Sequence, residues 1–519
     1  MTFKPLHRLL LLPGILLVIG MACNLPGTAV APTAQAPTLQ SGPFCGDGVC
    51  SGPENADICP ADCPAPATES PTQSPVSNLE TPSATAVASV EHTLTIGAPL
   101  AGQPIRPLLG VNVGPIAAGE GDNPDLTAEY REYGVTMVRT HDFYGPLDMA
   151  TLYPDQSADP ANSASYDFGR SDEVFVAIVG AGLEPYFRVG DSWNNSTGYP
   201  PADPRRPTDP ENWTRAAVEV VRHYRALAEQ AGAPFRYVEI WNEPDGAQFW
   251  DGSPIEFYRL FEQTAVALKA EFPDLQIGGP GFSPAGYAAP RGQQFSRGLL
   301  DHLQATGAPL DFLSWHVYAS EPEAFVEAAR YYRALLDEYG YAATESHITE
   351  WNTQFRDAQT DDPAVRTGAP ASAILTSAWI ALQQEGVHAS TFYRGTEPSI
   401  EMRTWFGLFY ADARPKPAAL AWKLWAATAA HPNRLELTGE DGALWALAGQ
   451  DGDGEVAVLV ANPSGMETSY ALARIAADTP LRILQISAPA TEVEEFTATV
   501  AGLSIPAYGV QLVLAGGSQ

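Results

Sequence analysis

The sequence predicts an α/β protein built on a (β/α)8 TIM barrel, with a C-terminal antiparallel β-sandwich domain and a disordered N-terminal stalk. From about Leu108 to His431, eight short apolar segments rich in β-branched residues alternate with long amphipathic segments. This alternation is typical of parallel strands that are each followed by a helix. After Asn433 the pattern changes to alternating apolar and polar residues, which indicates antiparallel strands.

The first pattern is compatible with two α/β folds, a closed barrel or an open doubly wound sheet. No Gly-x-Gly-x-x-Gly follows the first predicted strand, so the barrel is favoured. The eight predicted barrel strands are Leu108–Val113, Thr136–His141, Pro185–Val189, Tyr237–Trp241, Gln276–Gly279, Phe312–Tyr318, His347–Trp351 and Ser390–Arg394.

Start and stop signals bound several of the intervening helices. Asp209 and Pro210 supply an N-cap and a first-turn proline, and Gly232 supplies the C-terminal glycine. The run Ser253-Pro254-Ile255-Glu256 has the spacing of a capping box. Glu321–Gly340 repeats the amphipathic pattern, so we expect a helix there as well.

The C-terminal segment contains short strands joined by tight turns. Asp453-Gly454 predicts a hairpin turn, and we expect His92–Ile96 to return and donate a strand to this domain. The predicted strands are Leu444–Ala448, Glu455–Ala461, Leu481–Ile486, Phe496–Val500 and Val510–Leu514.

The charge balance excludes one class of partner. Of the 519 residues, 61 are acidic and 29 are basic, which gives a formal net charge of −32. Such a surface repels phosphate backbones and anionic lipid, so we expect no nucleic-acid partner. All five cysteines lie between Cys23 and Cys63, so the large C-terminal part does not depend on disulfides or zinc–thiolate sites.

Residues 1–23 have the pattern of a lipoprotein-type signal peptide. Lys4 and Arg8 precede an apolar run that is too short to span a bilayer. Gly20-Met21-Ala22-Cys23 resembles the lipobox of bacterial lipoproteins, whose cysteine is acylated, although that family usually has Leu where Gly20 stands. Ordinary cleavage after Ala29-Val30-Ala31 is the alternative. Both cleavage patterns predict export. The lipobox also predicts membrane attachment, and only through a lipid on Cys23.

Residues 24–92 form the predicted stalk, which is rich in proline, serine and threonine. Residues 45–63 within it contain four cysteines, which in an exported segment predict two disulfides with the pairing left open. Calcium binding by the acidic residues of this small module is an alternative function. The four cysteines are Cys45, Cys50, Cys59 and Cys63.

The two remaining predicted domains are the barrel over residues 93–432 and the sandwich over residues 433–519.

Two glutamates stand at the ends of predicted barrel strands, where the active sites of such barrels lie. Glu243 follows the fourth strand and Glu350 ends the seventh, and each is flanked by Trp and Asn. Two carboxylates at one barrel mouth raise each other's pKa, and aromatic neighbours add desolvation. Glycoside hydrolysis needs this arrangement, with one group protonated and the other ionised. A structural ion pair with a rim arginine is the alternative for a single glutamate, but it does not account for two.

The residues around these glutamates resemble those of glycoside hydrolase family 39, which includes β-xylosidases and α-L-iduronidases. The resemblance covers about Leu108 to His431 and is carried by four segments, of which the second-strand pattern Arg139-Thr140-His141 matches only loosely. The three others are Tyr237–Asp245 with Phe249-Trp250, Gly278-Gly279-Pro280, and Ser314–Tyr318.

The resemblance implies a role for each matching residue. Glu243 is expected to be the acid/base and Glu350 the nucleophile of a retaining mechanism, and Asn242 is expected to bind the sugar 2-hydroxyl. Four further residues are expected to bind the sugar or to orient and ionise Glu350, although each is also compatible with a purely structural role: Arg139, His141, His316 and Tyr318.

Other residues near the barrel mouth are weaker candidates. Arg394 and Glu397 follow the eighth strand, and a cationic Arg394 favours a uronic acid substrate, which keeps an iduronidase-like specificity open. Six aromatic residues are candidates for sugar stacking, although most aromatics in a barrel pack helices onto strands. They are Trp193, Trp250, Trp315, Trp405, Tyr144 and Tyr393, of which Tyr393 is included in the predicted substrate site.

We expect neither a metal nor another cofactor. His141, His316, His347 and His388 lie near strand ends, but no His-x-His or His-Glu-x-x-His spacing occurs. The sequence therefore predicts an exported glycosidase with a carbohydrate substrate, most similar to β-xylosidases. A non-catalytic carbohydrate-binding or adhesion protein is the alternative, but such a protein has no need to hold two like charges together.

Overall fold

The structure is a computed structural model of the chain. It describes residues 92–116, 124–192, 206–353, 363–397, 406–410, 412–439, 442–500 and 502–516. The chain divides into two compact units, Met1–Thr85 and Ala86–Gln519, and all described residues belong to the second. The predicted signal peptide, residues 24–91 of the predicted stalk, all five cysteines, Trp193 and Trp405 lie outside the described residues, whereas His92, the last residue of the predicted stalk, begins a strand.

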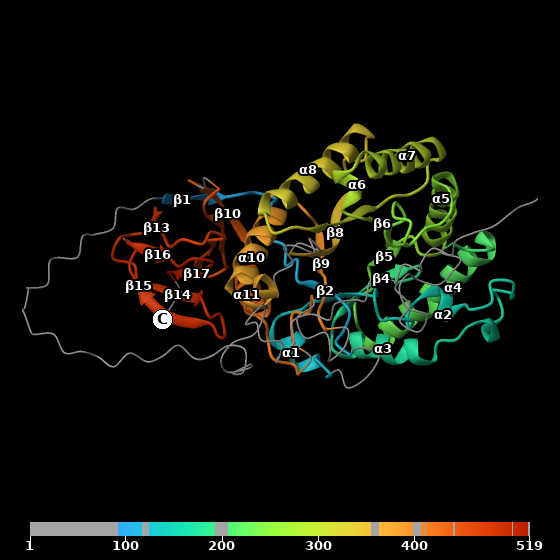
Figure 1. Cartoon of the computed structure of the whole chain (residues 1–519), viewed down its shortest axis with the longest axis horizontal. Coiled ribbons are helices and arrows are strands. Elements are labelled where there is room, and N and C mark those ends of the chain that lie inside the picture. Colours follow the sequence, from blue (N-terminus) through green and yellow to red (C-terminus); the bar gives the residue numbers. More distant parts are fainter. Residues whose placement is uncertain are drawn as a thin grey trace, which may run out of the picture. The chain divides into compact units, whose positions relative to one another are not determined.

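Eight parallel strands form a closed barrel, which confirms the predicted fold class (Figure 1). Closure is made by parallel pairing of the first barrel strand with the last, for example Val111 with Phe392, so the open-sheet alternative is excluded. The strands are β2 (Gly110–Asn112), β3 (Met137–Arg139), β4 (Glu184–Val189), β5 (Tyr237–Ile240), β6 (Gln276–Phe282), β7 (Phe312–Tyr318), β8 (Glu345–Asn352) and β9 (Ala389–Phe392).

Two helices around the barrel have the caps that the sequence predicts. The Asp209 side chain accepts a hydrogen bond of 3.0 Å from the Asn212 backbone N–H, and Gly232 adopts φ 68° at the C-terminal end. The predicted capping box at Ser253 and Glu256 is also present. The main helices are α3 (Gly169–Gly180), α4 (Pro210–Ala231), α5 (Pro254–Glu271), α7 (Pro290–Thr306), α8 (Pro322–Glu338), α10 (Ala369–Gln384) and α11 (Pro417–Ala429).

Shorter helical pieces lie in the connections between these elements, and none of them was predicted. They are α1 (Thr127–Glu132), α2 (Met149–Leu152), a 3-10 turn over Ser163–Ser165, α6 (Ala285–Ala288) and α9 (Pro363–Thr367). Among the residues that the structure describes, no helix combines the length and the apolar character that are needed to cross a membrane.

The C-terminal domain is one continuous sheet of nine strands in the order β15-β14-β17-β12-β11-β10-β1-β13-β16. Strand β1 joins it as expected from His92–Ile96, pairing antiparallel with β10 and parallel with β13. The remaining pairs are antiparallel. The strands are β1 (His92–Pro99), β10 (Asn433–Thr438), β11 (Trp445–Gln450), β12 (Val456–Ala461), β13 (Thr468–Ala473), β14 (Leu481–Ile486), β15 (Glu494–Ala498), β16 (Leu503–Ile505) and β17 (Val510–Ala515).

This sheet folds over on itself to enclose an apolar core. Tyr470 and Ile505, from one end of the strand order, share a buried cluster with Ile483 and Val513 from the other end. The domain thus has the layered interior of a sandwich although its strands form a single hydrogen-bonded sheet.

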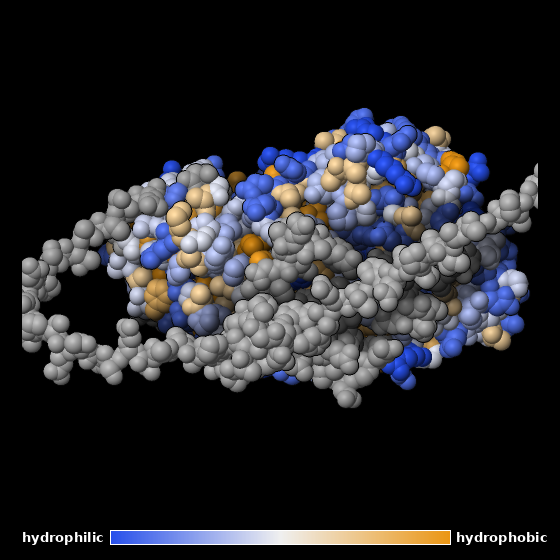
Figure 2. Space-filling view, viewed as in Figure 1, coloured by the Kyte–Doolittle hydropathy of each residue, from blue (hydrophilic) through white to orange (hydrophobic). Residues whose placement is uncertain are grey.

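The opposite face of the sheet packs against the barrel. Leu459 and Leu512 are fully buried and belong to the same apolar cluster as Trp379 of α10 and Trp425 of α11. Both helices are therefore apolar on two sides, one toward the barrel strands and one toward the sheet. On the face seen in Figure 2 the described surface is mostly hydrophilic, and hydrophobic residues are scattered over it.

Substitution at this interface should destabilise the protein more than substitution of an exposed apolar residue. Leu512→Ala removes a fully buried side chain from the contact between sheet and helices, so we expect the free energy of unfolding to fall by about 2–5 kcal/mol. Phe496→Ala, at a side chain that is 39% exposed, is the control and should cost less. Urea denaturation of the two variants tests this, and equal losses would contradict the packing.

Candidate active site

The barrel brings the predicted site residues together at the carboxyl ends of its strands. Arg139 is the last residue of β3, and Asn242 and Glu243 lie in the turn after β5. His316 and Tyr318 end β7, and Glu350 lies near the end of β8. Because all barrel strands run parallel, these ends meet at one rim of the barrel.

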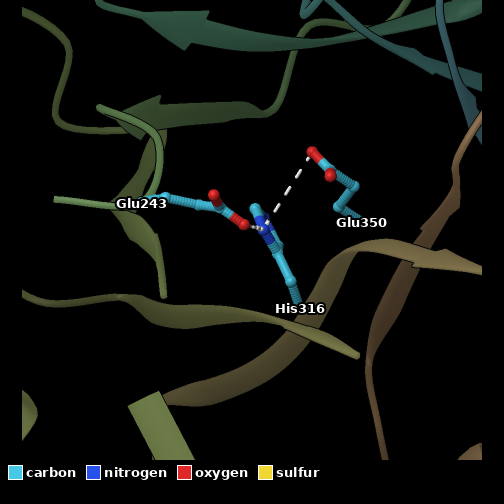
Figure 3. Close-up of side chains that lie close together, drawn as sticks. All are labelled: Glu243, His316 and Glu350. Carbon is cyan, nitrogen blue, oxygen red and sulfur yellow. Dashed lines mark hydrogen bonds and ion pairs between the residues drawn. The ribbon is translucent and has the colours of Figure 1, made fainter. Parts of the chain in front are cut away.

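Glu243 and Glu350 face each other across a narrow space. A carboxylate oxygen of each and a ring nitrogen of His316 all lie within 4.8 Å of one another. His316 Nδ1 is 2.8 Å from Glu243 Oε1 and 4.0 Å from Glu350 Oε2. In Figure 3 the imidazole lies between the two glutamate side chains. The predicted meeting of the two carboxylates is therefore present in the structure.

The backbone after β5 is held in an uncommon conformation that presents Glu243 to this space. Trp241 and Glu243 have φ values of 82° and 46°, in the left-handed region that side-chain-bearing residues rarely adopt. Two contacts fix the turn, because the Glu243 N–H donates to Gly281 O at 2.9 Å and the Trp241 indole donates to Phe249 O at 3.0 Å. Such strain persists only where surrounding contacts impose it, and it is common at functional sites.

Arg139 is the fully buried cation at the base of the site. Its Nη1 lies 3.3 Å from Glu350 Oε2 and donates to Asn112 Oδ1 at 3.0 Å. Its Nη2 donates to Asn242 Oδ1 at 2.8 Å, and its Nε donates to Glu239 Oε2 at 2.7 Å. One guanidinium thus orients four side chains from three strands and the turn after β5.

Two further predicted residues contact Glu350. The Tyr318 hydroxyl donates to Glu350 Oε1 at 2.5 Å. His141 Nε2 lies 3.7 Å from Glu350 Oε2 and 3.5 Å from Asp142 Oδ1. Tyr318 and Arg139 both favour the ionised form of Glu350, because they supply donors or positive charge to its two oxygens.

Tyr393 lies one step away from the glutamates. Its hydroxyl donates to Asp142 Oδ2 at 2.7 Å, and its ring centroid is 6.1 Å from that of Tyr318. Arg394 is buried and donates to the Tyr144 hydroxyl at 2.7 Å, while Glu397 is buried in an ion pair with Lys416. The two charged residues proposed as substrate selectors are therefore engaged within the protein.

The aromatic residues predicted to stack on a sugar differ in burial, among those that the structure describes. Trp315 is fully buried and its indole donates to Ser346 Oγ, and Trp250 is buried with its indole donating to Ser253 O. These two rings pack the barrel, as the structural alternative for such residues implies. Tyr144 is partly exposed beside Arg394.

Burial dominates the protonation of the two glutamates. It raises the pKa of Glu243 to about 8, with Asp245 adding to the rise and Arg139 opposing it. Burial also raises the pKa of Glu350, to about 7, and there the charge of Glu243 adds to the rise while Arg139 opposes it. Burial lowers the pKa of His316 to about 4, so this imidazole is neutral between the carboxyl groups. Of the two carboxyls, Glu243 holds a proton more firmly.

Two groups of side chains in the described part of the chain have the spacing of metal ligands. One is Glu243, His316 and Glu350, and the other is His431, Asp451 and Glu455. In the first, the His316–Glu243 contact has the length of an ordinary hydrogen bond. In the second, His431 Nδ1 is 2.9 Å from Ala427 O and its Nε2 is 3.2 Å from Glu455 Oε2.

Three residues of the site were missed at the sequence level, namely Asn112, Asp142 and Glu239. Each is fully or almost fully buried. Glu239 in Tyr237–Ile240 and Asn112 in Gly110–Asn112 are polar residues within apolar strands. This was an available signal, since a charged or amide side chain inside a barrel needs a buried partner.

The closed barrel with two facing glutamates at its carboxyl rim is the fold and site of a barrel glycosidase clan, and comparison with known proteins defines the family. The model of glycosyl hydrolases family 39 matches residues 101–374, and the chain belongs to this family. The protein is 25% identical over 247 residues to a β-xylosidase of Geobacillus stearothermophilus, covering 43% of this chain and 47% of that protein. A β-xylosidase of Caldicellulosiruptor saccharolyticus is 23% identical over 242 residues, covering 43% and 46%. The chain thus spans about half the length of these curated relatives.

Solved structures support the same fold over a longer stretch. A glucosidase from Croceicoccus marinus superposes with a TM-score of 0.66 at 23% identity, covering 82% of this chain and 99% of that one. A monomeric β-xylosidase from Caulobacter crescentus gives a TM-score of 0.62 at 18% identity, covering 82% and 100%. These likenesses extend the shared architecture beyond the family match.

The raised pKa of Glu243 should make the protein less stable in alkali than a variant without this charge. The carboxyl ionises near 4.5 in the unfolded chain and near 8 in the folded protein. The folded state therefore binds the proton more tightly, and the resulting stabilisation is present below pH 4.5 and lost as the pH rises through about 8. When the pH is raised from 5 to 9, the free energy of unfolding of Glu243→Gln should therefore increase relative to that of wild type. The expected increase is a few kcal/mol, at about 1.4 kcal/mol per pKa unit.

Chemical denaturation at the two pH values measures this difference. Glu338→Gln, at a side chain that is 55% exposed, is the matched control and should show little change. A Glu243→Gln variant whose stability follows that of wild type at both pH values would contradict the raised pKa.

Proposed function

We propose that the protein is a retaining glycoside hydrolase of β-xylosidase-like specificity, with Glu350 as the nucleophile and Glu243 as the acid/base. The observation that carries this proposal is the approach of the two carboxylates to within 4.8 Å of each other. Retaining glycosidases hold their two carboxyl groups about 5–5.5 Å apart, whereas inverting ones need about 6.5–9.5 Å to admit a water molecule.

The protonation of the pair supports the first step. Near neutral pH Glu243 keeps a proton, because its pKa is about 8, while Glu350 is partly ionised, with a pKa of about 7 and donors from Tyr318 and Arg139. A Glu350 oxygen attacks the anomeric carbon and forms a bond to it. Glu243 gives its proton to the leaving oxygen, and the glycosidic bond breaks with its electron pair on that oxygen.

Formation of the glycosyl–enzyme reverses the role of Glu243. The ester removes the negative charge of Glu350, and because two like charges raise each other's pKa, the pKa of Glu243 falls. Glu243 then takes a proton from water, whose oxygen attacks the same carbon and releases Glu350 as a carboxylate. Two displacements at one carbon retain its configuration.

The neighbouring residues fit binding and orienting functions. Asn242 Oδ1 is occupied by Arg139, so its amide N–H groups are the ones that can donate to a sugar hydroxyl. His316 is neutral and touches Glu243, so it can exchange a hydrogen bond with the acid without adding charge. His141 lies beside Glu350 and is suited to a second hydroxyl.

The substrate proposal rests on relatives named as β-xylosidases. We propose a neutral, xylose-containing glycan as the substrate. Arg394, the residue that kept a uronic acid open, is already bonded to Tyr144 and to Asp142 O. The N-terminal signal and Cys23 support a location outside the cytoplasm with a lipid anchor.

Substitution of the two glutamates by glutamine tests the proposal, with nitrophenyl β-xyloside and unsubstituted phenyl β-xyloside as substrates. Glu350→Gln should lower kcat/KM on both by at least about 10⁴-fold, because no nucleophile remains. Glu243→Gln should lower kcat/KM by roughly 10²–10⁴-fold on the phenyl glycoside, whose poor leaving group needs the proton, and less on the nitrophenyl glycoside. Undiminished activity of Glu350→Gln would remove the assignment, as would an equal loss on both substrates for Glu243→Gln.

A further inference from the structure

Glu239 is a fully buried carboxylate that the proposed reaction does not use. It lies on β5, four positions before Glu243, and its side chain has no solvent exposure. Three donors converge on it. Arg139 Nε is 2.7 Å from Oε2, and the hydroxyls of Ser314 and Thr349 donate to Oε1 at 2.6 and 2.8 Å. A charged group buried this deeply is costly unless its contacts serve a purpose.

The arginine that Glu239 binds is the same one that faces Glu350. Arg139 carries a single positive charge and meets two carboxylates, with Glu239 at 2.7 Å and Glu350 at 3.3 Å. Glu239 lies closer to the guanidinium than Glu350 does, and its negative charge opposes the effect of the arginine on Glu350. Glu350 is thereby left with incomplete compensation for its own burial, which agrees with its raised pKa.

The backbone beside this pair leaves little room for an additional side chain. A Cβ on Gly281 would lie 3.0 Å from His316 Nε2, 3.3 Å from Arg139 Nη2 and 3.4 Å from Glu239 Oε1. Gly281 also has φ +63°, which favours glycine. The site is thus built so that the arginine, Glu239 and His316 pack closely behind the glutamate pair.

We propose that Glu239 is a positioning residue, which fixes Arg139 between Asn242 and Glu350 and offsets part of the positive charge that this arginine presents to Glu350. The proposal rests on the proposed function, because it assigns Glu239 an effect on the nucleophile of that reaction. A purely structural Glu239 would affect stability alone.

The effect of Glu239 acts among several other titratable or charged groups around Glu350. Arg139 and His141 face it from β3 and the turn after it, and His316 and Tyr318 face it from β7. Glu243 faces it from the turn after β5, and Asp142 adds a like charge. The contacts and charges on Glu350 thus come from Arg139, His141, Asp142, Glu243, His316 and Tyr318.

A covalent inactivator isolates the ionisation of Glu350. Dinitrophenyl 2-deoxy-2-fluoro-β-xyloside should form a bond from a Glu350 oxygen to the anomeric carbon, and dinitrophenolate departs with the electron pair. This leaving group needs no proton, so the inactivation rate should depend on Glu350 and not on protonation of Glu243. The wild-type rate should fall below about pH 7 as Glu350 becomes protonated.

In the pH profile of inactivation, we call the fall of the rate at low pH the acidic limb. Glu239→Gln should move this acidic limb to a pH about one unit lower. The amide can still accept a hydrogen bond from Arg139 Nε, but it no longer carries the negative charge that opposes the arginine. Glu184→Gln is the matched control, since Glu184 is also a buried strand carboxylate paired with an arginine, Arg236, at 2.6 Å. Glu184 begins β4 at the other end of the barrel, so its variant should keep the wild-type limb whatever it does to stability.

Each outcome is decisive for one of the two proposals. If wild type gains no 2-fluoroxylosyl mass on Glu350, the proposed nucleophile is wrong, whatever Glu239 does. If wild type is labelled and Glu239→Gln keeps the wild-type limb, Glu239 is only structural. If Glu239→Gln does not fold, Glu239→Asp is used instead. It keeps the negative charge but places it farther from Arg139, because its side chain is one methylene shorter. A shift of the acidic limb to lower pH by less than one unit supports the proposal, and an unchanged limb overturns it.

Discussion

The candidate site depends on one buried arginine and the carboxylates that surround it. Arg139 is fully enclosed in the barrel and binds Glu239, Asn112, Asn242 and Glu350. A charge in that position is tolerated only because every side of it meets an acceptor. The four partners come from different parts of the barrel. The site is therefore assembled only when the barrel is closed. Loss of this centre would disturb the orientation of Glu350 and Asn242 together.

Burial of the two glutamates costs free energy of folding that the barrel fold itself does not require. Burial raises both pKa values, the charge of Glu243 raises the pKa of Glu350 further, and the backbone that carries Glu243 has a positive φ. Stability is commonly sacrificed in this way at active sites, where a strained or destabilised arrangement is the one that reacts. The surrounding barrel compensates through extensive apolar burial, which includes the helices α10 and α11 that are covered on both sides.

Much of the fold followed from the sequence because its signals are local. Strand periodicity, the capping box at Ser253 and the glycine at 232 each depend on a few neighbouring residues. The paired glutamates were also predictable, since barrel geometry places all strand ends on one rim. The single-sheet order of the C-terminal domain was not predictable, nor was the pairing of β1 with both β10 and β13, because partners distant in sequence decide them. A charged residue within the apolar strand Tyr237–Ile240 predicts that Glu239 has a buried partner, but not which one, because Arg139 is 100 residues away in the sequence.

Two carboxylates that act on one anomeric carbon in two successive displacements leave its configuration unchanged. Proton NMR of the sugar released from an aryl β-xyloside, recorded before mutarotation, measures that configuration. We expect β-xylose as the first product. Initial release of α-xylose would contradict this mechanism, since inversion requires a water molecule between carboxyl groups that lie farther apart.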